Sequence, residues 1–313
     1  MHLRDHLALL LLAALWGASF LFLRQASPVV GPIMVAAVRT LGGALVLLPL
    51  LMWRGGLHDF GKVRAHRTTL LGVALFSTLI PFLCLSQAAR SLPAGLMSIL
   101  NATTPLWGAL VGWVWTREPM GTRRLVGLAA GFAGVMLLSA ERLQSGEASL
   151  LAVVLVMLAT LCYALSVYMV QRRLHGVPSL TVTTSTLAMS GLALCWPAWW
   201  AGLPGAPAST WSSLSPTVWG ALLGLAVLCT GFAYDLFNRL IVRIGASRAI
   251  SVTFLIPIFG MLWGALFLGE SISLSMVLGT VVILAGTFLS NQSVPPAGSP
   301  SSPRPLSFDK ETP

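Results

Sequence analysis

The sequence predicts an all-α membrane protein in which ten transmembrane helices form two inverted-topology five-helix repeats. Two observations predict the class. Of the 313 residues, 56% are hydrophobic and only 9% are charged, whereas an ordinary globular chain is about 25% charged. The charges also lie in short runs between long apolar stretches. A third observation, a set of Pro, Gly and Glu residues that recurs at one constant spacing, predicts the repeats.

The composition excludes several other classes. So few charges cannot cover the surface of a water-soluble enzyme, and the apolar content excludes a disordered chain or a coiled coil. The net charge of +10 would suit a nucleic-acid binder only if a water-exposed domain carried a basic face, and no such domain is left. We therefore expect the lipid bilayer as a partner and no nucleic acid.

Ten stretches are apolar and long enough to cross a bilayer, which takes about 20 residues. We read the first as a span and not as a cleaved signal peptide, because it has a counterpart later in the chain. The predicted spans are Leu7–Leu23, Gly31–Trp53, Thr69–Ala89, Ala94–Thr116, Leu125–Ala140, Ser149–Val170, Leu180–Ala201, Thr217–Asn238, Ala246–Leu268 and Ser273–Ser290.

The basic residues predict the orientation. With the N-terminus in the cytoplasm, 15 of the 19 Lys and Arg residues fall in inner segments and 3 in outer ones, which is the bias expected of a membrane protein. Both termini are then cytoplasmic, in a cell (inner) membrane. The tail, residues 291–313, is rich in Pro and Ser and should be disordered.

The second half of the chain repeats the first. Six positions match at an offset of 152 residues: Pro105, Gly108, Gly112, Glu118, Gly127 and Gly134 correspond to Pro257, Gly260, Gly264, Glu270, Gly279 and Gly286. The first repeat spans residues 7–140 and the second 149–290. Because each repeat has five spans, an odd number, the second enters the membrane from the opposite side, an arrangement that recurs in secondary transporters.

These features together resemble a known family. Ten spans in two halves, the Trp16-Gly17-x-Ser19 start, Arg39 inside the second span and the Pro…Gly…Gly…Glu…Gly…Gly ending of each half are similar to the EamA-type transporters of the drug/metabolite transporter superfamily. The resemblance covers about residues 7–290. It implies a ten-helix fold around a central substrate cavity and export of small metabolites such as amino acids or drugs.

Arg39 is the only basic residue well inside a predicted span. A charge near the bilayer centre costs about 3 kcal/mol, so its side chain should face the bundle interior or water. We expect either that it binds a substrate carboxylate, or that it forms an interhelical pair or snorkels to the outer headgroups.

The acidic candidates have mainly structural interpretations. For Asp235 a pair with Arg239 or Arg243 is favoured over a proton-coupling role. Glu118 and Glu270, at corresponding span ends, are interpreted as caps or gate partners. So few buried acids give little support for proton antiport.

Neutral polar and aromatic residues on corresponding helices are the better cavity candidates, since small ligands favour mostly apolar pockets with a few placed polar groups. Hydroxyls that bond to their own helix are the alternative for about half of them. With Arg39, the predicted substrate-binding set is Trp16, Ser19, Thr78, Asn101, Thr104, Tyr163, Ser166, Thr230, Tyr234 and Thr253.

Glycines and prolines of the repeat are assigned to packing and kinks. Small residues spaced four apart let membrane helices approach closely, and proline kinks a helix by removing a hydrogen bond. The predicted set is Pro105, Gly108, Gly112, Pro257, Gly260 and Gly264, with Gly127 and Gly131 on a further small-residue face.

No H-E-x-x-H, G-x-S-x-G or P-loop motif occurs, so we expect no enzyme, no catalytic residue, no metal and no cofactor. The sequence predicts a gradient-driven transporter, an exporter of a small metabolite such as an amino acid or drug, working by alternating access. A non-transporting scaffold or receptor-like protein, an uptake carrier and a nucleotide-sugar carrier stay open as alternatives. The substrate, the coupling ion and whether the chain forms a homodimer also stay open.

Overall fold

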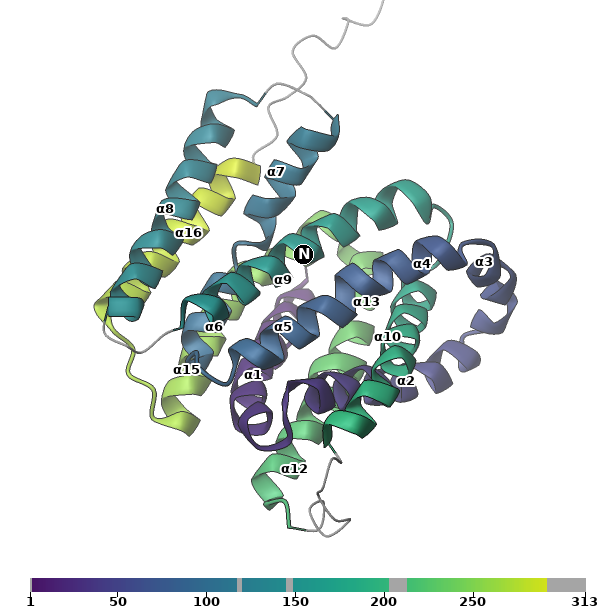
Figure 1. The fold of residues 1–313 in the computed structure, drawn as a ribbon. Coiled ribbons are helices and arrows are strands. Elements are labelled where there is room, and N and C mark those ends of the chain that lie inside the picture. Colours follow the sequence, from purple (N-terminus) through teal and green to yellow (C-terminus); the bar gives the residue numbers. More distant parts are fainter. Residues whose placement is uncertain (1, 117–119, 145–148, 203–212, 292–313) are drawn as a thin grey trace, which may run out of the picture.

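The computed structural model describes residues 2–116, 120–144, 149–202 and 213–291. Within these residues every regular element is helical, as Figure 1 shows. Glu118 and the tail from residue 292 onward lie outside the described residues. The first-half elements are α1 (Leu3–Val30), α2 (Pro32–Trp53), η1 (Gly56–Asp59), α3 (Phe60–Ala65), α4 (Arg67–Ala74), η2 (Leu75–Leu79), α5 (Ile80–Ala88), α6 (Ala94–Asn101), α7 (Thr104–Thr116) and α8 (Thr122–Gln144).

The second half has a similar order of long helices. Its elements are α9 (Leu150–Arg173), α10 (Ser179–Gly202), α12 (Pro216–Leu223), η3 (Gly224–Phe232), α13 (Ala233–Ile244), α14 (Ala246–Ile250), η4 (Ser251–Phe254), α15 (Ile256–Leu268) and α16 (Leu274–Asn291).

Eight helical segments are long and apolar enough to cross a membrane: Leu3–Val30, Pro32–Trp53, Arg67–Ala88, Ala94–Trp115, Thr122–Leu143, Leu150–Arg173, Pro216–Ile244 and Arg248–Leu268. Leu274–Ser290 is a shorter apolar helix, and α10 is 24 residues long. Many helices also expose large apolar side chains, such as Leu45 and Leu137 at 67% and 73% exposure. Such a surface suits lipid contact and would be costly in water. Ten spans remains a prediction.

Helix boundaries differ from the predicted spans where the backbone geometry decides them. α1 continues seven residues past Leu23 and ends at Gly31, whose φ of +83° an L side chain rarely adopts. The predicted span Ala94–Thr116 is interrupted between α6 and α7, just before Pro105. Proline cannot donate the backbone hydrogen bond that would continue the helix, and the freed Asn101 carbonyl accepts one from the Thr104 hydroxyl instead, at 2.8 Å.

Equivalent elements begin at matching positions in the two halves. α7 and α15 begin 152 residues apart, as do α8 and α16, whereas α1 and α9 begin 147 apart, as do α2 and α10. The π-helical segments η2 and η3 also correspond, and they carry the equivalent Thr78 and Thr230. π-helical turns inside α-helices are rare and are frequent at functional sites.

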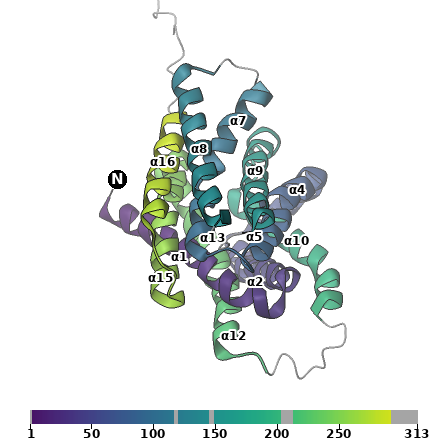
Figure 2. The same cartoon turned by 60° about the vertical axis from the view of Figure 1, so that its left-hand side comes forward.

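The halves pack against each other through equivalent helices. The two most extensive helix pairs are α2 with α10 and α8 with α16, and α1 packs on α15 as α9 packs on α7. Figures 1 and 2 both show α8 and α16 side by side. At their contact Gly127 and Gly286 leave no room for side chains, because a Cβ built on Gly286 would lie 2.6 Å from the Gly127 carbonyl oxygen.

The other repeat glycines differ in their surroundings. A Cβ built on Gly260 would meet Ser98 of α6, and one on Gly264 would meet the Glu270 carboxylate. On α7, Gly112 lies against Tyr168 of α9, whereas a Cβ built on Gly108 meets no atom within 4 Å. Close packing therefore occurs at three of these four glycines.

Candidate functional site

Arg39 lies between the two halves of the chain and is 5% exposed. Its Nε donates a hydrogen bond to Thr230 Oγ1 on η3, at 3.1 Å. The guanidinium carbon also lies 3.8 Å from the ring centroid of Phe82, which belongs to α5. This distance is typical of a cation–π contact. The buried Nη1 has no hydrogen-bond partner among the described residues.

Aromatic side chains from both halves pack with Phe82, either directly or through Tyr234. Trp16 on α1 contacts Tyr234 edge-on, with ring centroids 6.0 Å apart, and lies 5.1 Å from the ring of Phe237. Tyr163 on α9 and Tyr234 pack on the buried cluster that contains Phe82. We call Arg39, Phe82, Trp16, Tyr163, Tyr234 and Thr230 the Arg39 group.

Several other predicted site residues bond to their own helices. Ser19 Oγ donates to the Trp16 carbonyl at 2.6 Å, and Ser166 Oγ donates to the Tyr163 carbonyl at 2.8 Å. Thr253 Oγ1 likewise donates to the Ile250 carbonyl at 2.9 Å. Their hydroxyl protons are therefore used locally. Within the described part of the chain, no hydrogen bond joins Ser19, Ser166, Asn101, Thr104 or Thr253 to Arg39.

Thr78, the equivalent of Thr230, has a different partner. Its hydroxyl lies 2.6 Å from Ser190 Oγ on α10 and donates to the Ala74 carbonyl at 2.8 Å. The structure thus places Thr78 of η2 against Ser190 of α10, and Thr230 of η3 against Arg39 of α2.

The side chain of Glu270 lies against the N-terminus of α6. Its carboxylate accepts hydrogen bonds from the backbone N–H groups of Ala94, at 2.7 Å, and of Gly95, at 3.1 Å. The first N–H groups of a helix have no partner within the helix, and the positive end of the helix dipole favours an anion there. Glu270 therefore joins the loop after α15 to the N-terminus of α6. Its repeat counterpart, Glu118, lies outside the described residues.

Ion pairs gather at the ends of α1, α2 and α13. Asp235 pairs with Arg239 at 2.7 Å, and also with Arg54, from the end of α2, at 3.1 Å. Asp5 pairs with Arg243 at 2.8 Å. Of the two partners predicted for Asp235, Arg239 is confirmed, whereas Arg243 pairs with Asp5. The sequence did not predict the pair of Asp235 with Arg54 or the contact of Arg39 with Phe82. Nothing in the linear sequence signals that these side chains meet, because tertiary packing alone brings their helices together.

Two hollows are formed by the described residues at other places, and the Arg39 group lines neither of them. The larger, about 490 Å³, lies beside these ion pairs and is lined by Leu51, Arg54, Asp59, Asn238 and Arg239 among others. The smaller, about 240 Å³, contains Arg24, Arg142 and Glu270. Leu51 lies 12 residues beyond Arg39 on α2, which corresponds to roughly 18 Å of helix. The Arg39 group therefore lies away from the larger hollow.

Comparison with known proteins decides the family. The model of the EamA-like transporter family matches residues 4–140 and again residues 150–292. The chain belongs to the EamA-like transporter family. It is accordingly a multi-pass membrane transporter, and the family and the names of its relatives indicate transport and not enzymatic catalysis.

EamA-like relatives match over nearly the full length of the chain. "Uncharacterized transporter YvbV" of Bacillus subtilis is 28% identical, covering 92% of both chains. A protein of Salmonella typhimurium named "Probable amino-acid metabolite efflux pump" is 24% identical, covering 91% of this chain and 94% of its own. One solved structure, titled "Crystal structure of protein", matches with a TM-score of 0.60 at 15% identity, covering 93% of this chain and 98% of that one. This last likeness concerns the fold alone.

Proposed function

We propose that this protein is a gradient-driven secondary transporter that exports a small organic metabolite, such as an amino acid or drug, by alternating access. Ten transmembrane helices would form two inverted repeats, residues 7–140 and 149–290. The observation that carries the proposal is the correspondence of the two halves in helix starts, π-helical segments and packing partners.

Inverted repeats account for alternating access in physical terms. Two similar halves of opposite orientation give an inward-open and an outward-open state of comparable energy. The paired contacts of α1 with α15 and of α9 with α7 support this relationship, as does the family model matching each half once. The pair α8–α16 joins the halves at Gly127 and Gly286.

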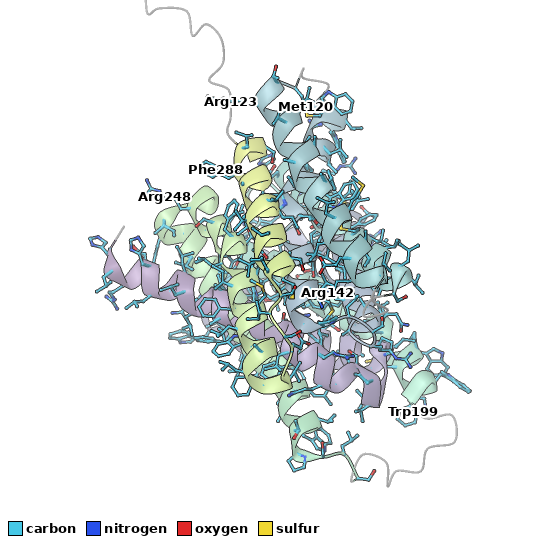
Figure 3. The ribbon with its side chains drawn as sticks, turned by 90° about the vertical axis from the view of Figure 1, so that its left-hand side faces the viewer. Met120, Arg123, Arg142, Trp199, Arg248 and Phe288 are labelled. Carbon is cyan, nitrogen blue, oxygen red and sulfur yellow. The ribbon has the colours of Figure 1, made fainter. Side chains whose placement is uncertain are left out.

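In the proposed orientation the protein lies in the inner membrane of the cell, and both of its termini are in the cytoplasm. Arg54, Arg239 and Arg243 then lie on the cytoplasmic side, in agreement with the positive-inside bias. Trp196, Trp199 and Trp200 would anchor the outer end of α10, and their exposure of at least 60% supports contact with headgroups. Arg123 and Trp199 lie toward opposite ends of the molecule in Figure 3.

The predicted substrate-binding residues remain candidates for lining the central path. Of these, the residues of the Arg39 group have the strongest support, because both halves contribute to it. Export is supported by the relatives named amino-acid metabolite efflux pumps. We propose Glu270 as a gate residue, since its bonds to α6 hold the ends of two helices together.

Transport is tested with the purified protein in liposomes loaded with a panel of radiolabelled amino acids and fluorescent drugs. We expect accelerated efflux of some panel members relative to protein-free liposomes. If no member moves faster, a scaffold or receptor-like role is favoured and the proposal fails.

Inversion is tested separately by accessibility tags. A tag after Gly121 should react only from the cytoplasm and one after Glu270 only from outside. Reaction of both tags from the same compartment would overturn the inverted arrangement.

A further inference from the structure

We propose that Arg39 binds the carboxylate of the transported molecule, while the aromatic rings of the Arg39 group contact its apolar part. The predicted substrate class is a small organic monocarboxylate with an aromatic or large aliphatic side chain. The inference rests on the proposed transport function and specifies its substrate.

The first argument is the uncompensated charge of Arg39. The structure describes five carboxylates, and each has a partner other than Arg39. They belong to Asp5, Asp59, Glu141, Asp235 and Glu270. Arg39 is 5% exposed, and a buried charge is stable only when it is paired and hydrogen-bonded. Its observed partners, the Thr230 hydroxyl and the Phe82 ring, carry no net charge.

The second argument is the hydrogen-bonding capacity that remains on the guanidinium. Nε is used by Thr230, whereas the buried Nη1 has no partner among the described residues. Arginine binds carboxylates through two parallel N–H donors, a geometry that lysine lacks. Thr230 and Phe82 hold one edge and one face of the guanidinium and leave its terminal nitrogens for an anion. In this arrangement Thr230 is a positioning residue.

The third argument is a difference between the two repeats. Thr78 of the first half lies 2.6 Å from Ser190 of the second half. The corresponding pair is Thr230 of the second half with Gly43 of the first half, 147 residues before Ser190. Since glycine has no hydroxyl, Thr230 accepts from Arg39 instead. A Cβ built on Gly43 would lie 2.5 Å from Thr230 Cγ2, so glycine also sets the close approach of α2 to η3.

The surroundings define what the carboxylate is attached to. Trp16, Phe82, Tyr163 and Tyr234 provide mostly apolar surface from α1, α5, α9 and α13. The nearest described acid in the chain, Asp235, which follows Tyr234, is already paired with two arginines and so provides no free carboxylate for an ammonium group. We therefore infer that this site recognises the carboxylate and is indifferent to an α-amino group.

Binding is tested on the purified full-length protein by thermal shift, since a ligand that prefers the folded state raises the Tm. The probes are 3-phenylpropionate, L-phenylalanine, 3-phenylpropionamide and phenethylamine, with sodium chloride as an inorganic anion. We expect both carboxylates to raise the Tm and the amide and the amine not to. Equal shifts with amide and acid, no shift with any carboxylate, or a response to chloride alone would overturn the proposal.

Variants assign the effect to Arg39. Arg39→Gln should abolish the preference for acid over amide, and Arg39→Lys should weaken carboxylate binding at least tenfold because the planar fork is lost. Thr230→Val should weaken carboxylate binding less than Arg39→Lys does and should keep the preference for acid over amide. Arg64→Gln, at an exposed arginine, is the matched control and should behave as the unmodified protein. If Arg39→Gln fails to fold, Arg39→Lys and Thr230→Val still decide: unchanged carboxylate binding by both would overturn the assignment.

Liposome efflux distinguishes failure of this inference from failure of the proposed function. Carboxylate binding that depends on Arg39 but is followed by no flux would leave the binding site standing and remove the transport role. If instead neutral or cationic drugs are transported, Arg39→Gln leaves their flux unchanged and no carboxylate binds, the transport role stands and the proposed carboxylate site is refuted.

Discussion

The contact between α8 and α16 gives the sharpest stability prediction. Gly286→Ala places a Cβ 2.6 Å from the Gly127 carbonyl oxygen, 2.7 Å from the Gly131 nitrogen and 2.8 Å from the Gly131 Cα. All three are backbone atoms, so no side chain can rotate away. Ordinary contacts lie at about 3.5–4.0 Å, and α16 must therefore move by roughly 1 Å.

The cost follows from that displacement. A gap of 0.5–1 Å forfeits about a quarter to a half of the dispersion attraction, and overpacking of a close contact typically costs about 1–3 kcal/mol. Taking about 2 kcal/mol, with roughly 2–4 °C per kcal/mol for a chain of this order of size, Gly286→Ala should lower the Tm by roughly 4–8 °C.

The assay is thermal unfolding of the purified protein in one detergent. Gly279→Ala is the matched control, because it makes the same substitution on the same helix and its Cβ would meet only Leu138, at an ordinary 3.4 Å. We expect that variant to be as stable as the parent or slightly more stable, since alanine favours a helix over glycine. Equal melting temperatures for the two variants would refute the reasoning.

Three further predictions follow from contacts outside the Arg39 group. Glu270→Gln should lower stability by about 1 kcal/mol in thermal unfolding, because one charged acceptor at the α6 N-terminus is lost; an unchanged Tm would show that the cap contributes nothing. Asp235→Asn should lower the free energy of unfolding, measured by thermal unfolding, by about 1–2 kcal/mol. This is less than the cost of breaking a fully buried pair, because Arg54 and Arg239 are 32% and 54% exposed. An equal loss of stability from Lys62→Gln, whose pair with Asp59 is exposed, would contradict this. The Lys62 ammonium and the Thr181 hydroxyl lower the pKa of Asp59 below its ordinary 3.8. The contact of η1 with α10 should therefore persist above pH 3.8 and be lost as the pH falls through the lowered value. The anisotropy of a fluorophore at Gly61→Cys, with the exposed Cys195 replaced by serine, should fall only once the pH is well below 3.8, and Asp59→Asn should keep it low throughout.

The candidate site was partly predictable from the sequence. Arg39, Trp16 and Tyr234 could be named because a charge or polar group inside an apolar span must face the interior. Phe82 could not, because one phenylalanine among many apolar residues carries no pattern. Arg54 likewise reads as an ordinary basic residue at a span end. The sequence placed Ser19 and Ser166 on the right helices. It could not decide whether their hydroxyls face a cavity or donate to a carbonyl of their own helix, because either partner satisfies the hydroxyl.

By itself the sequence determined the membrane class, the segments that are helical and the 152-residue correspondence of the halves. Lipid supplies no hydrogen bonds, so an apolar stretch of bilayer length must form a helix whatever its neighbours are. The tertiary structure alone decided which helices meet: α2 with α10 and α8 with α16, Glu270 on the first amides of α6, Thr230 on Arg39 and Ser190 on Thr78. These contacts depend on helix rotation and backbone distance, which small residues such as Gly43 and Gly286 set through packing between segments far apart in the chain.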